Sequence, residues 1–245
     1  MSAGLILEEG FLMNDLKKIL ASMADAAKRS GVKIIAGDTK VVNRGKGDGI
    51  FINTSGIGIL DDGVNISPSN IKSGDKIIVS GTIGNHGVAV MAERNGLSFN
   101  PPVLSDTAPL NQMVEEIIGY GGVHAMRDPT RGGLATTLKE MALESGLCFS
   151  IREASIPVPD GVRGASELLG IDPLYIANEG ILIAVVKRDA AESLLAILRK
   201  NPLGKDANII GEVSESPGGK VLLKTRIGGT RMIDMLSGEQ LPRIC

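Results

Sequence analysis

Helical and strand-like patterns alternate along almost the whole of this 245-residue chain, and this alternation restricts the fold more than any other feature. Apolar residues recur at helical spacing, with Asn14 as the expected first N-cap, over 14–30, 86–94, 110–121, 132–146 and 189–200. Short apolar runs typical of strands occupy 32–36, 50–60, 76–81, 147–151, 180–186, 208–213 and 220–224. Strands interleaved with helices predict an α/β or α+β fold.

The segment 61–75 is the best candidate for a domain boundary, because it is polar and contains Pro68 and two glycines. We therefore expect a short first domain over about 1–60 and a longer second domain over about 72–235. Residues 236–245, LSGEQLPRIC, contain Gly and Pro without periodicity. They are predicted to form an exposed, flexible tail.

Composition argues against several classes of protein. The net charge is −2, aromatic residues make up 2% and Trp is absent, so neither a basic footprint nor stacking platforms for nucleic acid are expected. No apolar run approaches the roughly 18–20 residues of a membrane-spanning helix, and the start does not resemble a signal peptide. Two cysteines, Cys148 and Cys245, provide no disulfide framework, which favours a cytoplasmic protein. Cys148 lies in an apolar run and is expected to be buried and inert.

The segment AGDTKVV (36–42) is the first candidate for chemistry, because it follows the predicted strand 32–36. Polar residues at strand ends often form ligand sites in α/β proteins. Asp38 can hold Mg²⁺, Thr39 can bond an anion, and Lys40 can neutralise phosphate or move protons. The structural alternative is an ordinary polar turn between two strands.

The segment RDPTRGG (127–133) directly precedes a predicted helix. Gly132 and Gly133 open that helix, whose free N–H groups attract anions, and Arg131 adds a donor suited to phosphate oxygens. Asp128 beside the arginine indicates a metal bridge or an ion pair. The spacing is not that of a Walker A loop, and the structural alternative is an ordinary capped helix start.

Three further features are weaker. SGTIGNHG (80–87) offers a second Gly-rich turn before a helix, with His86 as a possible contact, but a purely structural turn is the stronger alternative. Glu179 in NEG stands at the mouth of an apolar strand, where it can act as a general base or be an exposed loop residue. Cys245 is the last residue, where a free thiol is normally a liability and where no CaaX box is formed.

The combination of GDTKVV, DPTRGG, NEG and terminal PRIC resembles the HypE family of hydrogenase maturation proteins, the carbamoyl dehydratases. The likeness runs over essentially the whole chain. Looser versions of the first two motifs occur in aminoimidazole ribonucleotide synthetase and selenophosphate synthetase, so the tail is what singles out HypE. The resemblance implies a two-domain fold like that of aminoimidazole ribonucleotide synthetase. Its N-terminal domain binds ATP and pairs its strands with a second copy in a homodimer, and its C-terminal domain is α/β.

The resemblance also implies a reaction. A carbamoyltransferase partner, HypF, places a carbamoyl group on the terminal thiol. ATP phosphorylates the carboxamide oxygen, elimination leaves a thiocyanate, and the cyano group passes to iron on a HypC–HypD scaffold for NiFe-hydrogenase. By resemblance, Cys245 carries the substrate, and Lys40 and Glu179 handle or position protons. The ATP and Mg²⁺ contacts implied are Asp38, Thr39, His86, Asp128, Thr130, Arg131, Gly132 and Gly133, with Asp38 and Asp128 as metal ligands.

The chain departs from the family pattern at its start. The family has a further N-terminal segment with a Gly-rich stretch and acidic residues, whereas this sequence opens with MSAGLILEEGF, which resembles an interior helix of the family. We therefore expect weak ATP hydrolysis by this chain alone. Two alternatives stay open: another ATP-dependent kinase or synthetase of the same superfamily, and a non-catalytic module that offers its C-terminal peptide to a partner.

Overall fold

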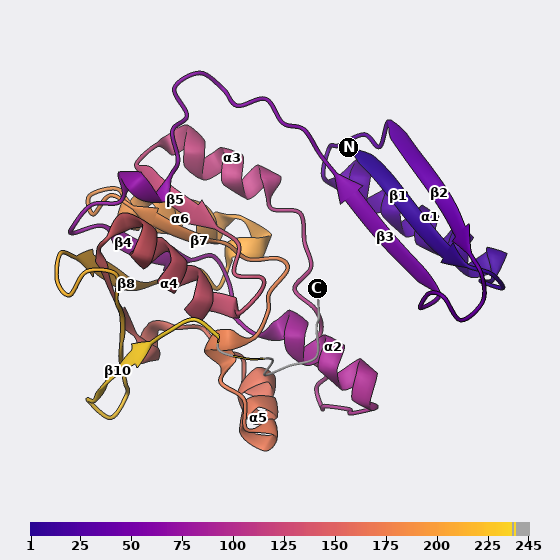
Figure 1. The fold of residues 1–245 in the computed structure, drawn as a ribbon. Helices are drawn as coiled ribbons and strands as arrows, with labels where there is room; N and C mark the ends of the chain where they lie inside the picture. Colours follow the sequence, from indigo (N-terminus) through magenta and orange to yellow (C-terminus); the bar gives the residue numbers. More distant parts are fainter. Residues whose placement is uncertain (237, 239–245) are drawn as a thin grey trace. The chain divides into compact units, whose positions relative to one another are not determined.

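The computed structural model describes residues 1–236 and 238 and separates into two compact units (Figure 1). Unit 1 is Met1–Val64, and unit 2 begins at Asn65. Each unit contains a sheet and at least one helix, so the α/β class predicted from the alternation is confirmed. In the part of the chain that the structure describes, no helix is long and apolar enough to cross a membrane.

Unit 1 is a three-stranded sheet with one helix. The strands lie in the order β2-β1-β3, with β1 parallel to β2 and antiparallel to β3. The helix α1 joins the two parallel strands and lines a cavity together with Ala3 and Leu5 of the sheet. The bounds are β1 Ser2–Glu8, α1 Met13–Arg29, β2 Ala36–Val42 and β3 Ile50–Ser55.

Four expectations for unit 1 are wrong. The opening residues form β1 rather than a helix, and 32–35 is irregular rather than a strand. AGDTKVV is itself the strand β2, because its backbone pairs in parallel with β1 from Ser2↔Ala36 to Glu8↔Val42. Backbone pairing with a neighbour thus outweighs the local polarity of these residues. The N-cap of α1 is Leu12, which makes no side-chain cap, rather than Asn14.

Unit 2 is built on a seven-stranded sheet in the order β10-β9-β6-β8-β4-β7-β5. Only the β9–β6 pair is parallel, and the other neighbours are antiparallel. The strands are β4 Lys76–Val79, β5 Val123–Arg127, β6 Cys148–Arg152, β7 Ile183–Val186, β8 Asn208–Ser214, β9 Val221–Lys224 and β10 Thr230–Ile233. The predicted burial of Cys148 in its strand is confirmed.

The helices of unit 2 are α2 Asn85–Asn95, α3 Asn111–Tyr120, α4 Gly133–Ser145, α5 Asp160–Leu169 and α6 Ala191–Lys200, with short 3₁₀ turns at 68–70, 153–155, 173–175 and 202–204. Apart from α5, these helices match predicted segments to within a few residues. Three elements are not predicted by the sequence patterns: α5, which contains Gly161 and Gly164, and the short strands β5 and β10. Glycines and short mixed-polarity runs leave too little periodicity for a local prediction.

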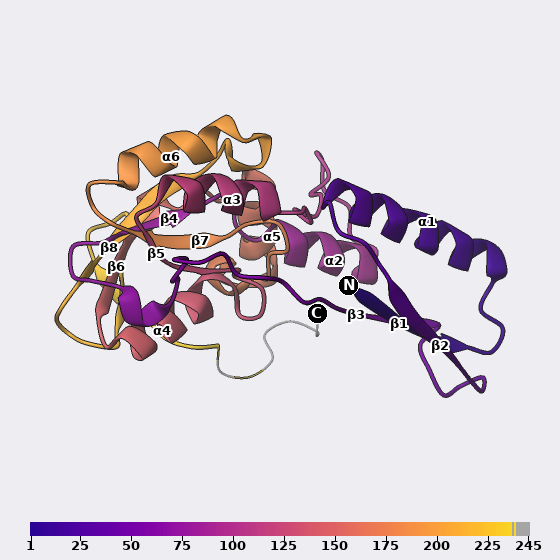
Figure 2. The same ribbon diagram turned by 90° about the horizontal axis from the view of Figure 1, so that it is seen from above.

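Helices lie on both faces of the unit 2 sheet, α4 on one face and α3 and α6 on the other (Figure 2). Each face carries a separate hydrophobic core. Alternate residues of β4 face opposite sides, because side chains alternate along a strand. Ile77 and Val79 belong to the core that contains α4, and Ile78 belongs to the core that contains α3 and α6. A third, smaller cluster joins α2 and α5. The sheet is therefore covered on both faces, and its polar loops emerge at its ends.

The loops of unit 2 fall into two groups, according to the end of the sheet at which they leave or enter a strand. Val79 of β4 and Arg127 of β5 both pair with Ile183 of β7, the strand between them. We call this the Val79 end of the sheet. Lys76 and Val123 both pair with Val186 at the opposite end, which we call the Lys76 end. Three motifs predicted from the sequence adjoin the Val79 end, although they are far apart along the chain.

Replacing Leu138 with Ala should lower the free energy of unfolding by about 2–5 kcal/mol, because the side chain is fully buried in the α4 core and its loss leaves a cavity. Leu143→Ala in the same helix is the matched control, since Leu143 is 53% exposed. It should change the free energy by no more than about 0.5 kcal/mol. Urea unfolding measures both variants, and equal losses would contradict this assignment of the core.

Candidate active site

Three loops meet at the Val79 end of the unit 2 sheet. The first, 80–84, leads from β4 into α2, and the second, 128–132, leads from β5 into α4. The third, 176–182, leads into β7. They contain the SGTIGNHG, DPTRGG and NEG motifs, so the structure brings together three of the five predicted clusters.

The buried amide of Asn178 joins all three loops. Its Oδ1 accepts the Gly84 backbone N–H at 2.6 Å, and its Nδ2 donates to the carbonyls of Pro129 and Ile176 at 3.0 and 2.9 Å. The Asn178 backbone N–H also donates to the Pro129 carbonyl at 3.2 Å. The side chain is 1% exposed, so its hydrogen bonds are made to the protein rather than to water, and they hold the three loops together.

Two glycines allow the loops to approach this closely. Gly133 has φ +60°, and a Cβ there would lie 2.6 Å from the carbonyl oxygens of both Leu174 and Ile176. A Cβ at Gly180 would collide with the backbone carbonyl of Asp106. Both positions therefore exclude any side chain, which explains why glycine stands in DPTRGG and in NEG.

The starts of α2 and α4 fit a phosphate-bearing ligand such as ATP. Gly84 and Gly132 are the N-caps, and neither helix has a side-chain cap. The Gly87 and Gly133 N–H groups donate to the carbonyls of Ala177 and Thr130, so the remaining N–H groups of the two first turns are the ones that can face an anion. Thr130 Oγ1 donates to Asp128 Oδ2 at 2.7 Å, which orients that carboxylate at the start of α4. Within residues 1–236 and 238, no group of three His, Cys, Asp or Glu can hold a metal alone. Magnesium commonly takes one or two carboxylates together with phosphates, and Asp128 fits that role.

Glu179 lies in the most acidic part of the site. Burial is the main cause that raises the pKa of its carboxyl above the usual range; Asp106 and Asp128 raise it further, while His86 lowers it. His86 is held through a 2.9 Å contact between Nδ1 and Ser105 Oγ. A half-buried carboxyl with a raised pKa accepts a proton more readily than an exposed glutamate, which suits a general base.

Two residues of the site were missed in the sequence. Asp106 Oδ2 accepts the backbone N–H groups of Glu179 and Gly180 at 3.1 and 2.9 Å, so it fixes the direction of NEG. Its Oδ1 is buried without a partner among the described residues, which leaves one acceptor for a ligand. Asn178 was overlooked because a polar residue in a loop gives no local sign of burial. The polar run SDTAP around Asp106 is the available signal, but such a run is typical of any loop.

The other predicted residues lie elsewhere. Asp38 and Lys40 belong to unit 1, where they are exposed on the same face of β2, in register with Gly4 and Ile6. Thr39 points to the opposite face, the one that α1 covers. All three are in mid-strand rather than at the strand end that the sequence predicted. The predicted tail begins at Leu236, and its carrier residue Cys245 lies outside the described residues.

The chain is anchored beside the site at residues 234–236, where the predicted tail begins. The Leu236 backbone N–H donates to Thr136 Oγ1 in the first turn of α4, at 3.3 Å. The Tyr175 hydroxyl donates to the Asp234 carbonyl at 3.0 Å, and buried Lys139 lies 3.4 Å from the Asp234 carboxylate. The pKa of Asp234 is lowered, first by the Met235 N–H and then by Lys139. These contacts place residue 236 next to the DPTRGG loop.

Comparison with known proteins defines the class. Residues 1–60 match the family model for the N-terminal domain of AIR synthase related proteins, and residues 72–224 match the model for their C-terminal domain. Both units of the chain therefore belong to the AIR synthase related class of proteins.

Individual relatives narrow the class to one family. Carbamoyl dehydratase HypE from Bradyrhizobium diazoefficiens is 51% identical over 247 residues, covering 100% of this chain and 71% of that protein. A crystal structure of HypE in complex with ATP has a TM-score of 0.94 at 47% identity, covering 100% of this chain and 74% of that one. A HypE–HypF complex gives 0.92 at 50% identity, covering 96% and 77%. The chain belongs to the HypE carbamoyl dehydratase family, which confirms the resemblance inferred from the motifs.

The raised pKa of Glu179 predicts a pH-dependent effect on stability. The folded state holds the Glu179 proton more tightly than the unfolded state, so ionised Glu179 costs free energy above its raised pKa. That cost disappears as the pH falls below the ordinary value of 4.5. Glu179→Gln should therefore raise the melting temperature slightly at about pH 7.5 and leave it unchanged at about pH 4.

Thermal unfolding at the two pH values measures this difference. Glu144→Gln, at an exposed position of α4, is the matched control and should show no such dependence. A lower melting temperature for Glu179→Gln at about pH 7.5 would mean that the ionised carboxylate is stabilising, contrary to its surroundings.

Proposed function

We propose that this chain dehydrates a carbamoyl group carried on its own Cys245 to a thiocyanate, at the expense of ATP, and so supplies the cyanide ligand of NiFe-hydrogenase. The family to which the chain belongs, and its terminal PRIC, support this proposal. A small-molecule kinase or synthetase of the same superfamily is not favoured, because the similar proteins reported above are HypE over the full chain.

The anchored start of the tail is the observation that carries the proposal. Leu236 is fixed to Thr136 in the first turn of α4, beside Gly132 and the DPTRGG loop. Nine residues follow it, 237–245, and an extended chain of that length spans at most about 30 Å. The terminal thiol is therefore tethered within reach of the loops that join at Asn178.

The reaction balances as the loss of one water from the carboxamide. The sulfur–carbon bond to Cys245 is kept, the carbon–oxygen bond breaks, and two N–H protons leave the nitrogen. When bound, ATP supplies the phosphoryl group that makes the amide oxygen a good leaving group, and that oxygen departs as phosphate. The nitrogen and carbon then form the triple bond of the thiocyanate.

Glu179 is the proposed base for the amide protons. Its carboxyl is half-buried, and its raised pKa makes it a stronger proton acceptor than an exposed glutamate. Asp106 directs the NEG backbone, and His86 adds positive character that limits the rise in pKa. Lys40 is the proposed second proton-handling or positioning group, and it is contributed by unit 1.

Nucleotide contacts are assigned to the remaining predicted residues. Asp38, Thr39 and the loop from Asp128 to Gly133, with Thr130 and Arg131, are proposed to bind ATP, with Asp38 and Asp128 toward Mg²⁺. Unit 1 and unit 2 are proposed to act as the N-terminal and C-terminal domains of one enzyme. HypF is the proposed carbamoyl donor enzyme, a HypC–HypD complex the proposed acceptor, and the cytoplasm the proposed compartment.

Cys245→Ala should abolish thiocyanate formation, because it removes the sulfur that carries the substrate. Nucleotide affinity should stay nearly unchanged and stability should change by no more than about 0.5 kcal/mol, because the variant keeps every contact within residues 1–236. The test incubates the full protein with carbamoyl donor, carbamoyltransferase and ATP, and measures the mass of the C-terminal peptide. The normal peptide should gain a carbamoyl group and then lose the mass of one water.

Cys148→Ala is the matched control, since it removes the only other thiol of the chain. It should leave thiocyanate formation intact, because Cys148 is fully buried in β6. A Cys245→Ser variant can carry an oxygen ester but cannot yield a thiocyanate. Normal cyanide delivery by the Ala variant would show that another residue carries the substrate.

A homodimer formed through unit 1 is also proposed. On the face of the sheet away from α1, Ile6 and Phe51 lie in register and are 44% and 51% exposed, which is unusual for large apolar residues in a small sheet. Phe51→Asp should convert a dimer to a monomer in light scattering at on the order of 10 µM. Ile227→Asp, at an exposed position of unit 2, should leave the dimer intact. A monomeric parent protein would refute the proposal.

A further inference from the structure

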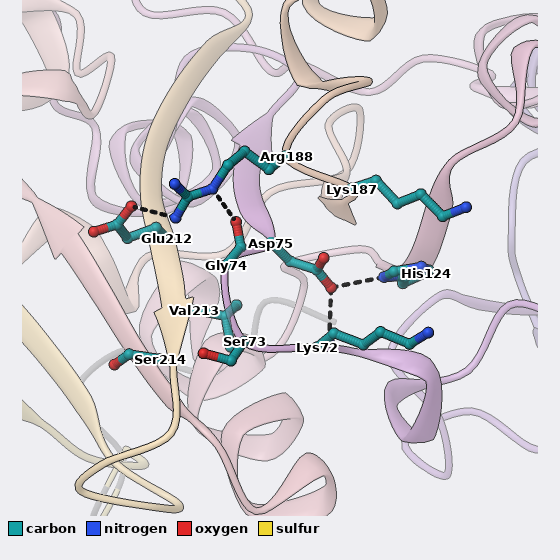
Figure 3. Close-up of a pocket in the computed structure, with 10 residues that line it drawn as sticks. All are labelled: Lys72, Ser73, Gly74, Asp75, His124, Lys187, Arg188, Glu212, Val213 and Ser214. Atoms are coloured by element: carbon teal, nitrogen blue, oxygen red, sulfur yellow. Dashed lines mark hydrogen bonds and ion pairs between the residues drawn. The ribbon is translucent and has the colours of Figure 1, made fainter.

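A second cavity of about 610 Å³ lies at the Lys76 end of the unit 2 sheet, opposite the candidate active site (Figure 3). Segments before β4, after β7 and along β8 line it, together with one residue of β5. The lining residues are Lys72, Ser73, Gly74, Asp75, His124, Lys187, Arg188, Glu212, Val213 and Ser214. Its size falls in the range of small-ligand pockets, and the proposed dehydratase chemistry uses none of these residues.

A buried Asp–His pair forms part of the wall. His124 Nδ1 lies 2.7 Å from Asp75 Oδ2, and the two residues are 9% and 4% exposed. The same carboxylate oxygen accepts the Lys72 backbone N–H at 2.8 Å. A carboxylate that holds Nδ1 fixes the orientation of the imidazole and leaves Nε2 for another partner. Among the described residues, Nε2 has no such partner.

The acidic groups of the cavity are already matched. Glu212 accepts Lys76 at 2.6 Å and lies 3.9 Å from Arg188, whose Nε donates to the Gly74 carbonyl at 3.2 Å. Asp75 is matched by His124. Two cations are left over, because Lys72 and Lys187 form no ion pair with any residue that the structure describes. Figure 3 shows their amino groups extending in the same direction on either side of His124.

We propose that Lys72, Lys187 and His124 Nε2 form a binding site for a tetrahedral oxyanion, either inorganic phosphate or a phosphomonoester. Two ammonium groups on either side of the ring suit a dianion and repel a metal cation. Nε2 donates a third hydrogen bond when the ring carries both protons, the form that an oxyanion in the cavity and Asp75 on the other side of the ring both favour. The cavity is larger than a bare ion requires, so the substituent of a phosphomonoester has room. This site is separate from the proposed ATP site.

The two histidines of the chain allow the two sites to be observed separately. His124 lies in this cavity and His86 lies at the Val79 end. Ring ¹⁵N–¹H correlation spectra of the full protein, labelled at histidine, should show saturable shifts of His124 as inorganic phosphate is added at constant ionic strength with chloride. Constant ionic strength removes general screening from the comparison. Glycerol phosphate in a parallel titration distinguishes the phosphomonoester from the free ion, and the tighter of the two identifies the class.

Matched lysine variants complete the test. In the double variant K72M/K187M, the phosphate concentration that gives half of the maximal His124 shift should rise about tenfold or more, because two charge-assisted contacts are lost. K205M, which removes an exposed lysine outside this cavity, should leave the shift unchanged. The proposal is overturned if neither phosphate ligand shifts His124, if only His86 responds, or if K72M/K187M binds as tightly as the parent protein.

Discussion

The hydrogen bonds of Asn178 are the interaction on which the candidate active site depends. Three loops that are remote in sequence meet at one end of the unit 2 sheet, and a single buried amide satisfies groups from all of them. A buried donor or acceptor left without a partner costs about 1–3 kcal/mol, so the loops are stable together rather than separately. Gly133 and Gly180 make the same arrangement sterically possible. The positions of the helix starts and of Glu179 follow from this junction.

The surroundings of Glu179 at this junction disfavour its ionised form and so raise the pKa of its carboxyl. Burial removes water, and Asp106 and Asp128 add negative charge, with His86 as the opposing influence. Asp106 is fixed by the two backbone N–H groups that also orient Glu179. The Asp106 carboxylate therefore has two effects: it fixes the backbone of NEG, and it raises the pKa of Glu179.

Much of this organisation was predictable from the sequence, and the exceptions have physical causes. The alternation of patterns predicted the α/β class, and most helices of unit 2 matched, because their apolar stripes are long. AGDTKVV was predicted to lie at the end of a strand rather than to form one, since its strand character comes from pairing with β1 rather than from its own residues. Glu179 and the DPTRGG loop were named correctly as polar residues at element ends, but whether they meet depends on strand register. Asn178 and Asp106 act through burial, which no local pattern reports.

Because the tail is anchored at Leu236, the proposed enzyme meets its substrate within one molecule rather than by binding it from solution. A thiol tethered by nine residues from Leu236 meets the site at an effective concentration set by the tether, which is typically millimolar for short flexible linkers. Dilution of the protein leaves that encounter unchanged, so the dehydration step has no Michaelis constant for its carbamoyl substrate. Concentration matters only when the terminal cysteine is loaded and unloaded. In the proposed function, control of the pathway therefore lies with the two partner encounters that load and unload Cys245 rather than with the active site.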